Sequence, residues 1–287
     1  MSRTSCLTSL LLAGALVSAL GCATGREQAA NLGQAAGFQP IRIETAPFVL
    51  RGWLREGRRG AAQRPELAVY IEGDGLAWIR PNRPSGDPTP TDPIGLRLAA
   101  ADPSGNPVLY LGRPCQYTEG ADRRGCSTED WTSARFSQRA VEALNAAIDQ
   151  AKAATGSGTV ALFGYSGGGA LAALLAERRS DVRFLGTVAG NLDPGLWTTL
   201  FGDAPLHGSL SPVDAAQATR NIPQLHVAGG RDEVVPLAVL DSWCRRLPDA
   251  RIVRVVLPDS GHGGPWVEVW PGLLLQTRKS APDLKGD

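Results

Sequence analysis

Residues 160–173 constrain this chain most strongly, because they join an apolar run to a glycine-rich turn and a helical pattern. Residues 160–163 are apolar, the turn reads Gly-Tyr-Ser-Gly-Gly, and an Ala/Leu-rich run follows it. This order predicts a buried strand, a sharp turn at Ser166 and a helix directly after it. Glycines on both sides of the serine allow the backbone to pass closely and leave the hydroxyl exposed. We therefore predict a nucleophilic serine here, against the plainer alternative of a structural turn rich in glycine.

Apolar runs separated by helical patterns continue along the rest of the chain. Two alternating runs predict a hairpin, and later continuous runs predict buried parallel strands. The predicted strands are residues 41–45, 48–54, 67–71, 108–111, 160–163, 184–189, 224–228 and 251–257. Helices are predicted at 94–101 behind Asp92, at 134–154 between Ser133 and Gly156, and at 237–247. Strands that alternate with helices indicate the α/β class.

Two further polar side chains follow predicted strands near the C-terminus. Asp232 lies in the sequence Gly-Gly-Arg-Asp-Glu-Val-Val-Pro, and His262 lies in Ser-Gly-His-Gly-Gly after the last strand. The chain has three histidines, of which His226 lies inside a predicted strand and His207 lies in a long connection. Because the carboxyl ends of parallel strands share one edge of a sheet, we expect Ser166, Asp232 and His262 to meet there.

The chain resembles the α/β-hydrolase superfamily in two respects. It has G-x-S-x-G at a turn between a strand and a helix, and an acid and then a histidine follow later in the sequence. The resemblance covers the chain from about residue 41 to its end. It implies the α/β-hydrolase fold, with a mostly parallel eight-stranded sheet, helices on both faces and a small lid insertion. It also implies a catalytic triad in which Asp232 orients His262 and His262 removes the proton of Ser166.

The resemblance also indicates an oxyanion hole. In the family, one N–H follows the nucleophile and a second comes from the loop after an earlier strand, often at a histidine–glycine motif. Here these positions are Gly167 and the turn Glu72-Gly73-Asp74-Gly75, so Asp74 or Gly75 would donate. Two acids beside a developing negative charge are unusual. Either their side chains point away, or they bind a cationic part of the substrate.

Asp193 competes with Asp232 for the role of the acid. It follows the strand after the elbow, and some α/β-hydrolases resemble this arrangement. Asp193-Pro194-Gly195, however, is typical of a turn in which the aspartate side chain bonds its own backbone. We therefore favour Asp232.

Residues 190–223 make a longer connection than the two strands on either side need. They contain turn residues, several large apolar side chains and a helical pattern at 213–219. We predict a small lid over the site, with a long structural connection as the alternative.

The N-terminus predicts export. Arg3 precedes an apolar stretch at 7–20, which is of signal-peptide length and ends in Ser-Ala-Leu-Gly-Cys. This ending resembles a bacterial lipobox, which implies a lipoprotein-type signal peptide over 1–22 and acylation of Cys22. Ala23 then resembles outer-membrane sorting, with the protein facing the periplasm. An ordinary secretory signal cut near Ala19 or Ala23 is the alternative.

The polar residues 23–38 predict a flexible tether, with the hydrolase domain at 39–280. Once Cys6 and Cys22 are set aside, three cysteines remain. Cys115 and Cys126 flank a polar loop and are predicted to form a disulfide in an oxidising compartment. Cys244 lies in a predicted helix and is expected to be a buried thiol. No Cys/His spacing resembles a zinc site, and we expect no metal or cofactor.

Composition narrows the function further. The 287 residues carry a net charge of +1, which does not suggest a nucleic-acid surface. We predict a serine hydrolase that cleaves an ester, thioester or amide of a small acyl substrate through an acyl-serine. One alternative is a peptidase or amidase in which Glu72 or Asp193 holds a substrate amine. The other is a non-catalytic binding protein that retains the fold.

Overall fold

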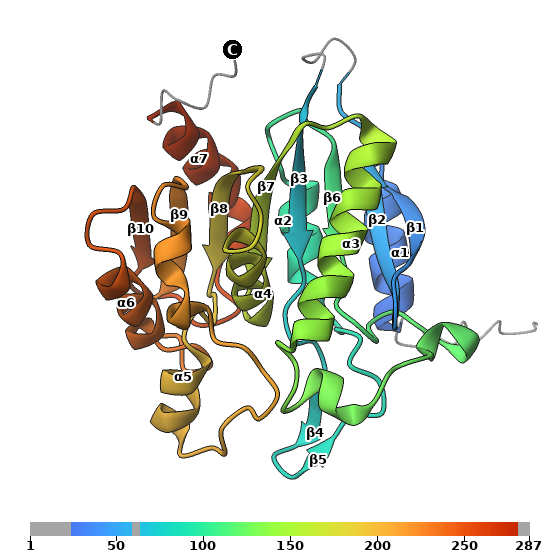
Figure 1. Ribbon diagram of the computed structural model, residues 1–287, viewed down its shortest axis with the longest axis horizontal. Helices are drawn as coiled ribbons and strands as arrows, with labels where there is room; N and C mark the ends of the chain where they lie inside the picture. Colours follow the sequence, from blue (N-terminus) through green and yellow to red (C-terminus); the bar gives the residue numbers. More distant parts are fainter. Residues whose placement is uncertain (1–23, 59–63, 281–287) are drawn as a thin grey trace, which may run out of the picture.

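The protein, described here by a computed structural model over residues 24–58 and 64–280, is built around an eight-stranded sheet (Figure 1). The spatial order of the strands is β1-β2-β6-β3-β7-β8-β9-β10. Pairing is antiparallel between β1 and β2 and between β2 and β6, and parallel everywhere else in this sheet. The strands are β1 (Gln39–Glu44), β2 (Val49–Arg55), β3 (Glu66–Ile71), β6 (Val108–Leu111), β7 (Thr159–Tyr165), β8 (Val182–Val188), β9 (Gln224–Gly229) and β10 (Ile252–Leu257). A separate small hairpin joins β4 (Trp78–Arg80) to β5 (Arg83–Pro84).

The continuous apolar runs form the buried centre of the sheet, as the sequence predicts. All four residues of β6 and five of the six in β3 are buried, because helices cover both faces of these strands. The predicted hairpin at the sheet edge is also confirmed, with Ile43 of β1 opposite Leu50 of β2. Because the central strands are parallel, the loops at their carboxyl ends lie along one edge of the sheet.

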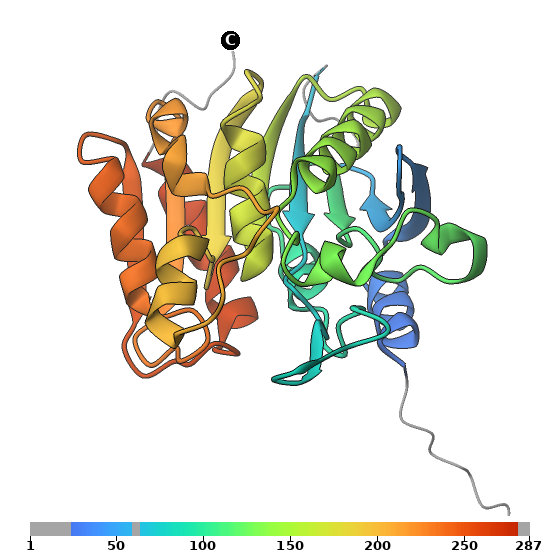
Figure 2. The same cartoon turned by 60° about the horizontal axis from the view of Figure 1, so that its bottom comes forward.

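Helices form a layer on each face of the sheet (Figures 1 and 2). One apolar core holds buried residues of α3 (Gln138–Thr155), α4 (Gly167–Ala176) and α6 (Leu237–Arg246). A second core, on the other face, holds residues of α1 (Gly25–Ala35), α2 (Ile94–Ala100) and α7 (Trp266–Lys279). The predicted α/β class and mostly parallel eight-stranded sheet are therefore confirmed. Throughout the part of the chain that is described, no helix has both the length and the apolarity needed to cross a bilayer.

One helix begins later than predicted, and a second begins where predicted but with a different cap. Helix α3 is capped by Ser137, whose hydroxyl accepts the N–H of Ala140, whereas the prediction gave this role to Ser133. Residues 134–136, at the start of the predicted helix, instead form turns, and the 3₁₀ helix η2 (Thr128–Trp131) precedes them. The C-terminus of α3 is as predicted, because Gly156 adopts a left-handed conformation that ends it. Helix α2 begins after Pro93, since Asp92 bonds the side chain of Arg97 rather than the backbone.

The prediction of a flexible tether at 23–38 is wrong, because most of this segment forms the helix α1. Thr24 and Glu27 form a capping box, in which each side chain accepts a hydrogen bond from the other residue's backbone N–H. Ala29 and Gly33 are buried, and Gly33 approaches the ring of Trp53 so closely that no larger residue fits. The folded domain therefore starts at α1 rather than at residue 39. The predicted signal segment and Cys22 lie outside the described residues.

The long connection at 190–223 divides into two parts. Its first part is α5 (Pro194–Phe201), which lies beyond the carboxyl end of β8 (Figure 1). Its second part contains η3 (Pro212–Asp214) and η4 (Ala216–Thr219), which pack against α4 and α6 with Val213 and Ala216 buried. These two short 3₁₀ helices replace the single helix predicted at 213–219. The second part is thus a structural connection, and a lid role for α5 stays a prediction.

His226 is a buried neutral histidine inside β9. Its two ring nitrogens bond Thr187 Oγ1 and Gln224 Oε1, each at 2.8 Å, and burial lowers its pKa from 6.5 to about 3. Between these two values the unfolded chain binds a proton that the folded protein does not bind. Stability is therefore complete above about pH 6.5 and falls as the pH drops below it.

We expect His226→Gln to remove this part of the pH dependence. In wild type, the histidine contributes a slope of about 1.4 kcal/mol per pH unit between about pH 6 and pH 4. Urea unfolding at several pH values measures the slope for each variant. His207→Gln, at an exposed histidine, is the control and should keep the wild-type slope. An unchanged slope in folded His226→Gln protein would contradict this assignment.

Candidate active site

Ser166 occupies a strained turn between β7 and α4. Its φ is +52° and its ψ is −123°, a conformation that side-chain-bearing residues rarely adopt and that costs about 1–3 kcal/mol. The flanking glycines are required by close packing. A Cβ on Gly164 would lie 2.1 Å from the carbonyl oxygen of Gly168, and one on Gly168 would lie 2.3 Å from that of Ile71. The glycines thus permit the turn that presents the serine.

Ser166, His262 and Asp232 form one chain of hydrogen bonds. Ser166 Oγ lies 3.0 Å from Nε2 of His262, and Nδ1 of His262 lies 2.8 Å from Oδ2 of Asp232. The carboxylate is fully buried, whereas the imidazole is partly exposed. These are the distances at which a base can take a hydroxyl proton and an acid can orient that base. The structure therefore brings together the three side chains that the sequence singled out.

Neighbouring groups hold the acid and the histidine in place. The other oxygen of Asp232 accepts the N–H groups of Val234 and Val235, at 2.9 and 2.8 Å. The carbonyl oxygen of His262 accepts bonds from the Tyr165 hydroxyl and from the indole N–H of Trp266. Because both loops are tied down, the imidazole is oriented before any substrate arrives.

The competing acid, Asp193, has a structural role. One of its oxygens accepts the N–H of Leu196 and caps α5, and the other accepts the hydroxyl of Ser242 at 2.5 Å. It is buried, and neither bond leads to His262. This is the turn chemistry expected from Asp193-Pro194-Gly195.

The glycine-rich turn after β3 lies against the nucleophile. A Cβ on Gly73 would meet Cβ of Ser166 at 3.3 Å, so this turn and the elbow are in contact. The N–H of Gly73 bonds the side chain of Glu72, and that of Leu76 bonds the carbonyl oxygen of Pro88. Within residues 24–58 and 64–280, no hydrogen bond engages the N–H of Asp74 or Gly75, the two predicted donors of this turn. Gly167 is the first residue of α4, where backbone N–H groups lack partners inside the helix.

Two buried arginines neutralise the acid in this turn. Arg113 and Arg135 each donate to one carboxylate oxygen of Asp74, the latter at 2.6 Å. Burial alone would raise the pKa of Asp74, but the two guanidinium groups outweigh it and hold the pKa at about 2. A Cβ on Gly167 would lie 2.0 Å from the carboxylate and 2.7 Å from Arg113, so the cluster touches the elbow. Two cations and one anion leave positive charge where an oxyanion would form.

Glu72 points away from the site. It is buried beneath the start of α2, where its carboxylate accepts the N–H groups of Gly73 and Gly95 and the hydroxyl of Tyr110. Burial raises its pKa. The first of the two options for these acids therefore holds for Glu72, which is not available to bind a cationic group.

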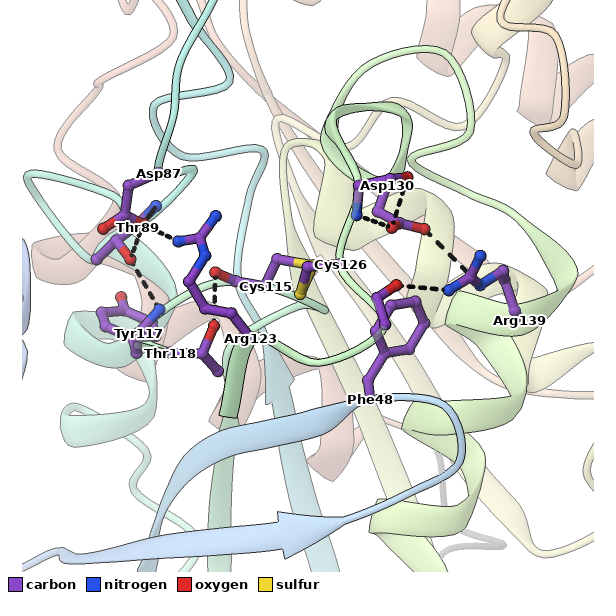
Figure 3. The surroundings of a disulfide bond; sticks show 12 residues. Phe48, Asp87, Thr89, Cys115, Tyr117, Thr118, Arg123, Cys126, Asp130 and Arg139 are labelled. Carbon is purple, nitrogen blue, oxygen red and sulfur yellow. Dashed lines mark hydrogen bonds and ion pairs between the residues drawn. A yellow bond between two sulfur atoms is a disulfide. The ribbon is translucent and has the colours of Figure 1, made fainter. Parts of the chain in front are cut away.

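The loop that follows Arg113 is closed by the predicted disulfide. Cys115 and Cys126 are joined, with their Cα atoms 5.8 Å apart. Next to the disulfide, the amide of Gln116 donates to the carbonyl oxygen of Gly73 and accepts the N–H of Arg113. Figure 3 shows the surroundings of the disulfide. On one side the N–H of Tyr117 donates to the hydroxyl of Thr89, and on the other Arg139 pairs with Asp130. The loop thus holds the glycine-rich turn after β3 in place. Cys244 was expected to be buried and is only partly buried.

We expect Asp74→Ala to destabilise the fold by about 3–5 kcal/mol. The substitution leaves Arg113 and Arg135 buried without their carboxylate, which is the costly way to break a buried ion pair. Urea unfolding measures the change. Asp259→Ala removes an exposed partner of Arg231 and should leave the stability nearly unchanged. Equal small changes in both variants would show that the cluster does not stabilise this turn.

Three residues near the site, Arg113, Arg135 and Gln116, were not predicted from the sequence. Arg113 could have been predicted, because it follows β6 and therefore lies at the same sheet edge as Ser166. Arg135 precedes α3 in an irregular segment, and no pattern marks it. Among the described residues, no group of three or more His, Cys, Asp or Glu side chains is arranged to hold a metal ion.

Comparisons with known proteins bear on the fold. No protein-family model matches the chain, and no curated protein sequence does. Solved structures do match. Acylaminoacyl peptidase from Pyrococcus horikoshii superposes with a TM-score of 0.62 and 15% identity over 85% of this chain. The match covers only 41% of the peptidase, so this chain corresponds to less than half of that protein.

Two structures match over nearly their whole length. Est1E from Butyrivibrio proteoclasticus has a TM-score of 0.59 and 15% identity, over 84% of this chain and 99% of its own. XC6422 from Xanthomonas campestris, described as an α/β serine hydrolase without a lid, has a TM-score of 0.56 and 15% identity, over 85% and 94%. At this level of identity the similarity concerns the fold. The chain has the α/β-hydrolase fold.

Proposed function

We propose that the protein is a serine hydrolase that cleaves an ester, thioester or amide through an acyl-serine intermediate. One observation carries the proposal, namely the continuous chain of hydrogen bonds from Ser166 through His262 to the buried Asp232. A serine hydroxyl is a weak nucleophile at neutral pH and needs an adjacent base. In this proposal each of the three residues has a defined task.

In the first half of the reaction, Ser166 Oγ attacks the acyl carbon while His262 Nε2 takes the hydroxyl proton. Asp232 keeps the proton on Nδ1 and stabilises the imidazolium that forms. The N–H groups of Gly167 and of Asp74 or Gly75 bind the oxyanion, a contribution of about 3 kcal/mol for each donor. His262 then protonates the leaving group, and the acyl-serine is formed. Water, deprotonated by His262, releases the acid in the second half.

The peptidase or amidase alternative now needs different residues from those first suggested. Glu72 and Asp193 are buried and bonded within the protein, so neither supports binding of a substrate amine. Asp74 is already paired with two arginines. The pairing of these three acids within the protein favours acyl esters over amine-bearing substrates, and the similarity in fold to acylaminoacyl peptidase is the reason for including amides in the test.

A substrate panel tests the proposal. Nitrophenyl esters of increasing acyl length are compared with aminoacyl nitroanilides, using wild type and Ser166→Ala. We expect ester hydrolysis to exceed amide hydrolysis by at least tenfold in kcat/KM, and Ser166→Ala to lose both. Faster turnover of the aminoacyl amides would favour the peptidase. No turnover of any member by folded wild type would favour a binding protein that retains the fold.

We also propose that the protein is an outer-membrane lipoprotein that faces the periplasm, acylated at Cys22. The apolar segment at 7–20 followed by Leu-Gly-Cys supports this. In a bacterium with an outer membrane, wild type should incorporate labelled fatty acid and sediment with the outer membrane, whereas Cys22→Ser should not incorporate label. An unlabelled wild-type protein whose N-terminus is another residue would favour the ordinary secretory signal.

A further inference from the structure

Large exposed apolar side chains gather at the end of the molecule that carries the candidate active site. Of the eight such side chains in the described part of the chain, six lie in segments that follow the carboxyl ends of β3, β8 and β9. Their exposed fractions are between 40 and 52%. They are Leu76, Trp78 and Ile79, Leu200 and Phe201, and Val234. We call these six residues the apolar rim.

The two halves of the apolar rim lie on either side of the nucleophile. In the sheet, β7, which leads to Ser166, lies between β3 and β8. Figure 1 shows the β4–β5 hairpin and α5 projecting at the same end of the molecule, whereas α7, which begins beside His262, runs towards the opposite end. The side of α5 is linked to Val234 by the indole N–H of Trp197, which donates to its carbonyl oxygen at 2.7 Å. The two halves of the rim therefore flank the turn that carries Ser166.

The hairpin of the rim combines aromatic, aliphatic and basic side chains. Trp78 and Ile79 are exposed in β4, and Arg80 and Arg83 at the hairpin turn are exposed beside them. Within residues 24–58 and 64–280, neither arginine forms a salt bridge. Tryptophan is preferred at the boundary between lipid and water, and arginine is attracted to anionic headgroups. This composition matches a bilayer surface better than it matches an aqueous one.

The chain enters the fold at the same end. Gly25, the first residue of α1, lies against the carbonyl oxygen of Pro90, and Arg26 bonds Asp87 and the carbonyl oxygen of Thr118. The same segment holds the rim, since the carbonyl oxygen of Pro88 accepts the N–H of Leu76. Cys22, the proposed acylation site, precedes Thr24 by two residues in the sequence. A lipid on Cys22 would hold this end of the molecule, and no other, against the membrane.

We infer that the apolar rim is a docking surface for an anionic lipid bilayer, so that the candidate active site faces the membrane. The inference combines the six exposed side chains, the two basic residues of the hairpin and the position of the chain entry. It rests in part on the proposed anchor at Cys22. It does not depend on the chemistry proposed for Ser166.

Site-directed fluorescence tests the orientation. The exported protein, processed as the cell processes it, carries an environment-sensitive nitrobenzoxadiazole probe on Ile79→Cys, Phe201→Cys or Leu275→Cys. Each variant also carries Cys244→Ser, and each is mixed with vesicles of phosphatidylglycerol and phosphatidylcholine. Leu275 is the matched control, because it is similarly exposed but lies in α7. We expect at least a twofold rise in emission at 79 and 201 and no change at 275.

Vesicle sedimentation separates the rim from the anchor. In a Cys22→Ser background, the pair Ile79→Ser and Phe201→Ser is compared with the control pair Val253→Ser and Leu275→Ser, after both have been shown to melt like the parent. We expect the bound fraction to fall at least threefold only for the rim pair. Binding should also weaken on neutral phosphatidylcholine and in high salt, where the charges of Arg80 and Arg83 are screened.

Each outcome decides between the possible occupants of the rim. If the emission of all three probes does not change while the acylated protein sediments with vesicles, the anchor holds the protein without docking and the inference is wrong. A rise at 79 and 201 that depends on protein concentration and needs no vesicles would indicate a second copy instead. If wild type incorporates no fatty acid but still binds vesicles through the rim, the proposed acylation of Cys22 is wrong and the docking surface is supported.

Discussion

Ser166→Ala is expected to lower kcat by about 10⁶ while the protein stays folded. The hydroxyl is the only atom of the Ser166–His262–Asp232 chain that can form the acyl intermediate, and the rest of the machinery cannot act without it. Since the residual rate comes from binding and the oxyanion hole alone, removing His262 as well should cost little more. Steady-state hydrolysis of a nitrophenyl ester measures the loss.

The matched control is Ser260→Ala, in the loop that carries His262. This variant should turn over like wild type, and both variants should unfold at the same temperature as wild type to within a few degrees. Turnover by folded Ser166→Ala at more than about one thousandth of the wild-type rate would mean that another residue is the nucleophile.

Asp232→Asn is expected to lower kcat by about 10⁴, the second largest effect. The carboxylate accepts the proton on Nδ1 of His262, so Nε2 is left free to receive the proton of Ser166. An asparagine amide can donate to Nδ1 instead and hold the imidazole in the wrong tautomer. The loss should fall on kcat, because the substrate does not touch the buried carboxylate.

Asp193→Asn is the matched control for this prediction. Asparagine can still cap α5 and bond Ser242, so we expect less than a tenfold change in kcat. Both variants are compared after thermal unfolding has shown that they fold. A collapse of kcat in Asp193→Asn, with near-normal turnover by Asp232→Asn, would transfer the role of the acid to Asp193.

The sheet and the three central side chains were predictable because their signals are local. Buried parallel strands require continuous apolar runs, such as residues 67–71 and 108–111, and these runs stand out from the helical patterns. The glycines around Ser166 are required by contacts of about 2 Å with backbone atoms, so the motif and the geometry have one cause. The order of the loops then follows from the shared edge of parallel strands.

Other features were missed because they depend on contacts between distant segments. The pairing of Asp74 with Arg113 and Arg135 joins residues that are 39 and 61 positions apart, and no spacing rule connects them. For the same reason, the sequence showed only the two acids of the turn after β3, and the two arginines that neutralise Asp74 were not expected.

Helix α1 was misread for a different reason. Its polar composition resembles a linker, but Ala29 and Gly33 are small enough to pack closely on the domain, and the capping box of Thr24 and Glu27 fixes its start. The capping box is readable in the sequence as Thr-x-x-Glu and would have indicated a helix. The correction matters for the folded domain, which begins at the capping box of α1 and not at residue 39.

Mapping the site of covalent labelling by a fluorophosphonate tests whether Ser166 is an activated nucleophile. The probe reacts with a serine only where a base activates it and donors stabilise the phosphoryl oxygen. We expect stoichiometric labelling of wild type, with mass spectrometry placing the adduct on the peptide at Ser166, and competition by acyl esters that are substrates. Folded wild-type protein that takes up no label, or that carries the adduct on a serine other than Ser166, would contradict the account.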